Sequence, residues 1–157
     1  MLGVGPFFVT RRIRFEEFVY RGVPSPSPDV TLCFAQSGDL QIEIIAQHDD
    51  APSAYRDFLA AGHDGMQHLA AWFDQDDPYR AACLDLEARG LRQVHAGKAA
   101  GLEVRFAYYE GPGGGTPLIE LAQATKPEVI GFAEMVATAG ADWDGHDPVR
   151  TMAGVAE

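Results

Sequence analysis

Two short apolar runs, about half a chain apart, each carry a single carboxylate in their middle. The first run is QIEIIAQ over residues 41–47, and it is echoed by LIELAQ over residues 118–123. Alternate side chains of a strand point to opposite faces, so Glu43 and Glu120 each project from a pleat with apolar neighbours. A buried carboxylate is costly unless a positive partner offsets its charge. The repetition therefore predicts two carboxylates that converge on something positive.

The bulk properties of the chain narrow the class of protein. The 157 residues carry a formal net charge of -11 and are 46% hydrophobic, which is enough for the core of one domain or two small fused modules. An acidic surface repels phosphate backbones and argues against nucleic-acid binding. No apolar stretch approaches the roughly 18 residues of a membrane span, and the first residues lack the pattern of a signal peptide. Cys33 and Cys83 are expected to be small core residues in a reducing compartment, so we expect a soluble cytoplasmic protein.

Strands dominate the expected structure of the first half. After a loop over residues 3–7, alternating side chains predict a strand over residues 15–20. Two further strands, over residues 30–35 and 40–46, are joined by the tight turn Ser-Gly-Asp. A short helix over residues 53–61 is expected to end at a glycine. The first half thus supplies three strands and a helix.

The second half has a more complete pattern. A strand over residues 68–73 precedes a helix over residues 77–89, for which Asp77 is the expected N-cap and Pro78 the first helical residue. Three strands are expected to follow, over residues 91–95, 102–109 and 117–122. A capping box then predicts a helix over residues 125–139, and the tail over residues 142–157 has no periodicity and is expected to be a surface extension.

Three motifs together resemble one family. They lie at residues 41–44, 64–70 and 118–121, and in order and spacing they are similar to the vicinal oxygen chelate superfamily. That superfamily includes glyoxalase I, methylmalonyl-CoA epimerase, extradiol dioxygenases and bleomycin-resistance proteins. The resemblance implies an α+β fold in which two βαβββ modules form a cupped mixed sheet, and it covers nearly the whole chain up to Gln123.

The resemblance also implies a domain organisation. A glyoxalase-like domain is expected over residues 1–124, with module one at residues 1–62, module two at residues 63–124, and a C-terminal helix and tail at residues 125–157. Module one lacks an opening strand and helix, so it is expected to be incomplete. A homodimer is implied as well, because members of the family often build the cup by pairing modules.

Metal ligands in the glyoxalase and epimerase branch come from the first and last strand of each module. By resemblance, Glu43 matches the last strand of module one, His68 the first strand of module two, and Glu120 its last strand. The fourth ligand would lie on the opening strand that module one lacks. A three-ligand site, a site completed by a partner chain or by an upstream segment, and a metal-free protein all stay open.

Two carboxylates and an imidazole suit a borderline divalent ion such as Zn, Ni, Co, Mn or Fe(II). Three protein ligands leave positions for a small-molecule substrate that chelates through neighbouring oxygens. The resemblance therefore implies a metal-dependent isomerase, epimerase or lyase acting on a small carbonyl or thioester compound through a metal-stabilised enolate. Glu120, ahead of Glu43, is the expected proton shuttle.

Alternative roles for the same residues stay open. The two glutamates can instead be ion-paired with Arg14 or Arg105 on facing strands, and His68 can be a structural residue. A metal-free member of the family would bind or sequester a hydrophobic or aromatic small molecule. A ring-cleaving dioxygenase would use two histidines and a glutamate, which gives Glu43 no role. Four aromatic residues are possible pocket walls, although such residues are more often core: Phe34, Trp72, Phe106 and Tyr108.

Overall fold

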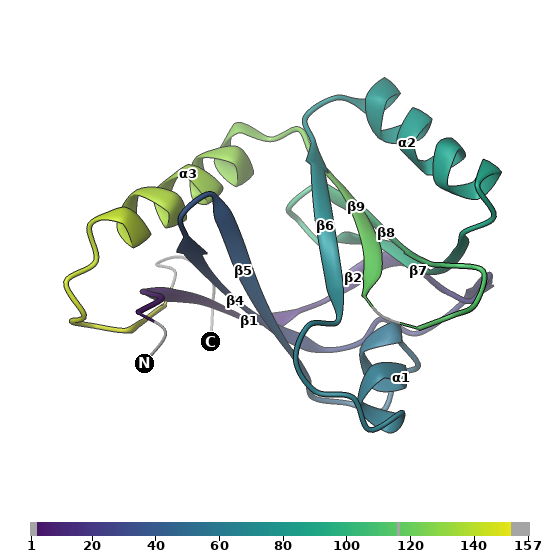
Figure 1. Cartoon of the computed structure of the whole chain (residues 1–157), viewed down its shortest axis with the longest axis horizontal. Coiled ribbons are helices and arrows are strands. Elements are labelled where there is room, and N and C mark those ends of the chain that lie inside the picture. The colour runs from purple at the N-terminus through teal and green to yellow at the C-terminus, as the bar shows by residue number, and fades with distance from the viewer. Residues whose placement is uncertain (1–2, 116, 152–157) are drawn as a thin grey trace. The chain divides into compact units, whose positions relative to one another are not determined.

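The computed structural model describes residues 3–115 and 117–151 (Figure 1). The chain divides into two compact units. The described residues form ten strands and three helices in two mixed sheets, which confirms the predicted α+β class. Neither unit is continuous in sequence. Unit 1 consists of Met1–Ile13, Asp29–His48 and Pro127–Glu157, and unit 2 of Arg14–Pro28 and Asp49–Lys126.

Unit 1 is built on a sheet in the order β10-β1-β4-β5. The neighbours β1, β4 and β5 are antiparallel, and β10 pairs parallel to β1 at the other edge. The β4–β5 hairpin turns at Gly38, whose φ of 58° is one that glycine adopts without steric cost. The strands are β1 (Phe7–Ile13), β4 (Val30–Ser37), β5 (Leu40–Gln47) and β10 (Val149–Thr151).

The helix α3 (Pro127–Ala141) packs on β4 in this unit (Figure 1). Phe132 makes edge contacts with the rings of Phe34, at 5.5 Å between centroids, and Phe8, at 6.4 Å. Val136, one turn further along, has no exposed surface. These apolar contacts hold the C-terminal helix, predicted from its capping box, against the sheet of unit 1.

Truncating the central aromatic residue of α3 is expected to destabilise the protein. Phe132→Ala removes both ring contacts and leaves a cavity on the sheet, at a cost of about 2–3 kcal/mol in the free energy of unfolding. Ile130, on the same helix, is 40% exposed, so Ile130→Ala is expected to cost less than about 1 kcal/mol. Urea denaturation of the two variants measures the difference, and equal costs would contradict the packing of Phe132.

Unit 2 is built on a sheet in the order β3-β2-β7-β8-β9-β6, in which β6 lies parallel to β9 and the other neighbours are antiparallel (Figure 1). The succession β6, α2, β7, β8, β9 is the predicted βαβββ module. The elements are β2 (Phe15–Tyr20), β3 (Val23–Pro24), α1 (Ala54–Ala60), β6 (His68–Phe73), α2 (Asp76–Ala88), β7 (Arg92–Ala99), β8 (Val104–Glu110) and β9 (Leu118–Ala124).

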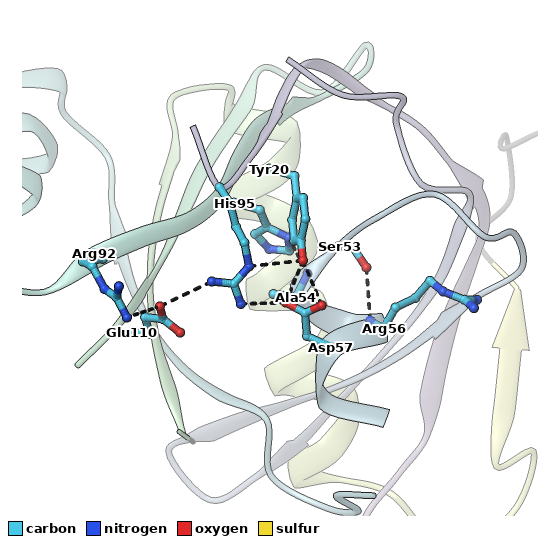
Figure 2. Close-up of polar contacts among 9 residues, drawn as sticks. Tyr20, Ser53, Ala54, Arg56, Asp57, Arg92, His95 and Glu110 are labelled. Carbon is cyan, nitrogen blue, oxygen red and sulfur yellow. Dashed lines mark hydrogen bonds and ion pairs between the residues drawn. The ribbon is translucent and has the colours of Figure 1, made fainter. Parts of the chain in front are cut away.

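The two faces of the unit 2 sheet are covered differently. On one face, Tyr79 of α2 packs in an apolar cluster with Ala107, Tyr109 and Leu121. The opposite face is aromatic, and Tyr55 of α1 packs against it through its contacts with the rings of β7 and β8. Ser53 is the N-cap of helix α1, and its Oγ accepts the backbone N–H of Arg56 at 3.2 Å (Figure 2). Because the strand register alternates faces, the residues that face α1 include the side chain of Glu120.

Three expectations need correction, and a fourth is confirmed. Residues 7–13 form β1, although residues 3–7 were expected to be a loop and no strand was expected directly after them. The strand predicted over residues 15–20 is confirmed as β2, and it pairs with β7 in unit 2. Helix α2 begins at Asp76 after Gln75, one residue before the expected cap, because two aspartates in the first turn favour the helix N-terminus. The tail contributes β10; residues 152–157 lie outside the described residues.

Candidate metal centre

His68 and Glu120 are placed by the parallel pairing of β6 and β9. His68 stands opposite Leu118 in the ladder, and Ala70 stands opposite Glu120. The Leu118 N–H donates to the Gln67 carbonyl at 2.9 Å and so starts the ladder just before His68. Paired residues of a parallel ladder share a face, so the His68 and Glu120 side chains lie on the same face, two residues apart.

The two side chains meet at their polar ends. The distance from His68 Nε2 to Glu120 Oε2 is 3.3 Å, and only 11% and 10% of the two side chains are exposed. With its lone pair toward the carboxylate, an imidazole nitrogen in a dry place repels that oxygen unless a cation lies between them. The pair therefore fits one half of a metal site.

The other ring nitrogen of His68 is also engaged. Its Nδ1 lies 2.7 Å from Oε1 of Gln67, the residue that precedes it. The carboxamide oxygen is an acceptor, so Nδ1 carries the proton and donates it. The lone pair of the neutral ring then lies on Nε2, the atom that faces Glu120.

A row of titratable residues crosses the sheet from Glu120. Tyr108 of β8 stands directly opposite Glu120, and His95 of β7 stands opposite Tyr108. The Tyr108 ring makes an edge contact with His68 at 5.0 Å between centroids and with His95 at 4.3 Å. Tyr108 is 2% exposed and His95 is fully buried. These rings exclude water from the side of the pair nearest the sheet.

His95 is held neutral by its surroundings. Burial, and secondarily the electrostatic effect of nearby His68, lowers the pKa of His95 to about 3. Its Nδ1 accepts the backbone N–H of Ala54 at 3.4 Å (Figure 2), so its proton lies on Nε2. That N–H has no hydrogen-bond partner among the described residues and lies among the rings of Tyr55, Phe18 and Tyr108. His95 is thus a neutral core residue beside the site.

Glu43 belongs to unit 1, where it lies on β5 opposite Phe34 of β4. Its place in unit 1 matches that of Glu120 in unit 2. Each glutamate lies on the last strand of an antiparallel set of three, β1-β4-β5 or β7-β8-β9, and each stands opposite an aromatic residue. The sequence repeat around Glu43 and Glu120 therefore corresponds to a repeated position in the strand topology. The role of Glu43 as a third ligand stays a prediction.

The arginines considered as alternative partners have carboxylates of their own. Arg105 Nη1 lies 3.0 Å from Asp76 Oδ1, on the α2 face of the sheet and away from Glu120. Arg14 Nη1 lies 3.4 Å from Asp49 Oδ2. The imidazole of His68 is the partner that the carboxylate of Glu120 meets across the β6–β9 ladder.

A second group of polar side chains in unit 2 is centred on Asp57 of α1 (Figure 2). The Tyr20 hydroxyl donates to Asp57 at 2.8 Å, and Arg21 Nη2 binds the same carboxylate at 2.8 Å. Hydrogen bonds with Tyr20 and Asp57 raise the pKa of Arg21, and burial raises the pKa of Tyr20. Glu110 connects Arg21, at 3.4 Å, to Arg92, at 2.9 Å.

A cavity of about 160 Å³ lies beside this network, still within unit 2. Arg21 and Asp57 form its polar wall, Phe58 and Leu118 contribute apolar walls, and Gln67 lies at its margin. An apolar cavity of about 150 Å³ accepts benzene, so the space is that of a small molecule or of one part of a larger one. Because Gln67 also contacts His68, the cavity adjoins the candidate metal centre.

Two residues of the site were not predicted from sequence. Gln67 is part of the motif at residues 64–70, but nothing local indicates that its side chain binds its neighbour. His95 has no partner motif, and its only signal is alternation: it shares a face of β7 with Gly97, across from Tyr108 and Phe106. Among the four possible pocket walls, Phe106 and Tyr108 are buried on this face, whereas Trp72 is 51% exposed.

The chain belongs to the glyoxalase/bleomycin resistance protein/dioxygenase superfamily. The model of a family in this superfamily matches residues 1–109, which confirms the resemblance inferred from the motifs. The match includes Glu43 and His68 and ends before Glu120. No curated protein matches the chain. None of the helices among the described residues is long and apolar enough to cross a membrane.

Proposed function

We propose that this chain is a metal-dependent isomerase, epimerase or lyase that acts on a small carbonyl or thioester compound. The observation that carries the proposal is the pair formed by His68 Nε2 and Glu120 Oε2, 3.3 Å apart with little exposed surface. Membership of the superfamily supports the broad class. The substrate cavity is proposed to be the space that adjoins Gln67.

The donor set fits a divalent ion. His68 and Glu120 would hold it, and Glu43 is proposed as the third ligand because its topological position in unit 1 repeats that of Glu120. One imidazole nitrogen with carboxylate oxygens suits Zn, Ni, Co, Mn or Fe(II) better than the hard ions Mg and Ca, which prefer oxygen ligands. When bound, such an ion polarises a carbonyl and makes an adjacent C–H more acidic.

The residues of the chain would then carry the proton. Glu120 accepts a proton from the carbon next to the substrate carbonyl and returns it, to the same carbon on the other face or to a neighbouring atom. His68 keeps its lone pair directed to the site because Nδ1 is hydrogen-bonded to Gln67. Tyr108 and His95 keep water away from the back of the carboxylate. The residues in these roles all belong to unit 2. Glu43 of unit 1 would add a further ligand.

Removing the metal is expected to lower the melting temperature of the purified protein. An ion present at 100 times its Kd adds about 2.7 kcal/mol to the free energy of unfolding, which corresponds to roughly 5–10 °C for a chain of this size. Differential scanning fluorimetry with and without a chelator measures the change, and adding back Zn, Ni, Co or Mn should restore the melting temperature. A melting temperature that chelation leaves unchanged would instead favour a metal-free protein that binds a hydrophobic or aromatic small molecule.

We further propose that the protein acts in the cytoplasm as a homodimer, as the resemblance to the family implies. Size-exclusion chromatography with light scattering is expected to give about twice the mass of the 17.0 kDa chain. A monomer at micromolar concentration would contradict the proposed assembly.

A further inference from the structure

The carboxamide of Gln67 directs its oxygen to His68, while its NH₂ group has no hydrogen-bond partner among the described residues. Oε1 lies 2.7 Å from His68 Nδ1. Nε2 of the same side chain is buried and has no hydrogen-bond partner among the described residues. A buried donor without a partner is unfavourable. The oxygen's contact with His68 is therefore kept in spite of that cost.

The orientation of the carboxamide decides which ring nitrogen of His68 holds the proton. With Oε1 toward the ring, Nδ1 donates and Nε2 keeps its lone pair. With the carboxamide turned over, its NH₂ would donate to Nδ1, and Nε2 would carry the proton toward Glu120. Only the first arrangement leaves the atom 3.3 Å from the Glu120 carboxylate able to bind a cation.

The backbone of Gln67 is fixed as well. Its carbonyl accepts the N–H of Leu118 at 2.9 Å, at the point where the β6–β9 ladder begins. Gln67 is thus anchored to the strand that carries Glu120, and its side chain reaches the ring of His68. One residue sets both the position of the imidazole relative to β9 and its tautomer.

We propose that Gln67 is a positioning residue that holds His68 in the tautomer with a free Nε2, ready to bind the metal. This inference rests on the proposed function, in which Nε2 is a ligand. Outer partners that donate to or accept from a ligating histidine orient the ring, and their loss typically weakens metal binding by 10-fold to 100-fold. Gln67 would act through His68, without contact to the substrate's reacting atoms.

The first experiment reads the tautomer in metal-stripped protein. Long-range ¹H–¹⁵N correlation spectra at alkaline pH, with the His68 ring assigned by its loss in His68→Asn, show which nitrogen is protonated. The wild-type ring is expected to have its proton on Nδ1. Gln67→Leu removes the acceptor and is expected to move the proton to Nε2, while Gln67→Glu keeps an acceptor oxygen and should keep it on Nδ1.

The second experiment measures Zn²⁺ affinity by competition with a chelating dye. Gln67→Leu is expected to raise the Kd about 10-fold to 100-fold, and Gln67→Glu should stay within a few-fold of the wild type or bind more tightly. Gln75→Leu is the matched control, since Gln75 precedes α2 and its side chain makes no capping hydrogen bond. Its Kd should equal that of the wild type.

The outcomes separate this inference from the proposed function. A wild-type ring with its proton on Nε2 or on both nitrogens overturns the role of Gln67, and this measurement needs no variant to fold. Equal tautomers and equal Kd values in wild type and Gln67→Leu overturn it too. If the wild type has the expected tautomer but binds no Zn²⁺, Co²⁺, Ni²⁺ or Mn²⁺, the proposed function fails, and Gln67 only orients a structural histidine.

Discussion

Glu120→Gln is expected to lower turnover roughly 100-fold to 10 000-fold for any carbonyl or thioester compound that the wild-type protein converts. The substitution keeps the size of the side chain opposite Tyr108 but removes its negative charge and its ability to accept a proton. Only 7% of Glu120 is exposed, so bulk solvent is poorly placed to take over the proton. The loss should appear in kcat as well as in kcat/KM, because the carboxylate acts on the transition state.

Two further variants test whether the loss of turnover is specific to Glu120. Glu16 is exposed on β2, so Glu16→Gln is a matched control that should retain wild-type turnover. Glu43→Gln is expected to weaken metal binding and to lower turnover less than Glu120→Gln, since Glu43 is proposed as a ligand and Glu120 as both ligand and base. Full turnover by Glu120→Gln, or an equal loss in Glu16→Gln, would contradict the assigned role.

Acid is expected to destabilise the protein through His95. The unfolded chain binds a proton at this residue near pH 6.5, whereas the folded protein binds it only near pH 3. Between these values the unfolded state holds more protons, so stability falls as the pH falls through this window. At about 1.4 kcal/mol for each pH unit, the full window is worth roughly 4–5 kcal/mol. Above about pH 6.5 His95 contributes no pH dependence.

The test compares how steeply the free energy of unfolding changes with pH, and not its absolute value. His95→Asn offers an amide in place of the imidazole and cannot take the proton, although the smaller side chain lowers stability at every pH. Urea denaturation between about pH 4 and pH 7 is expected to give a shallower dependence of the free energy of unfolding on pH in this variant than in the wild type. His63→Asn, at an exposed histidine, is the control for replacing a histidine by asparagine. Parallel curves for wild type and His95→Asn would contradict the buried neutral state of His95.

The parts of the fold that local sequence determines were predictable. The hairpin of β4 and β5 follows from two alternating runs around Ser37, Gly38 and Asp39, and the βαβββ order of the second half follows from periodicity and caps. The carboxylates in β5 and β9 are visible because an ionisable residue in an apolar strand is uncommon. Such signals lie within one element and need no knowledge of its neighbours.

Pairings between distant segments were not predictable from the same signals. Strand β10 pairs with β1 across almost the whole chain, and β2 pairs with β7 although it follows β1 directly in sequence. A strand pattern states which residues alternate and does not state which edge the strand joins. Because of these pairings, segments of the two units alternate along the sequence.

The sequence indicated the two side chains that meet in the candidate site, and it did not indicate the residues that support them. His68 and Glu120 were selected by type and motif, and the parallel register of β6 and β9 brings them together. Gln67 and His95 act through a hydrogen bond and through burial, which depend on the packed structure. A glutamine next to a histidine, or a histidine in an alternating strand, is also common in proteins that have no site at that position.

The most direct measurement is the binding of divalent ions to metal-stripped protein. Isothermal titration calorimetry with Zn²⁺, Co²⁺, Ni²⁺ and Mn²⁺ gives the affinity and the number of ions bound per chain. The wild type is predicted to bind one ion per chain, and His68→Ala and Glu120→Gln are each predicted to lose that binding while remaining folded by circular dichroism. A folded wild-type protein that binds none of these ions, or variants that bind as tightly as the wild type, would contradict the assignment of His68 and Glu120 as metal ligands.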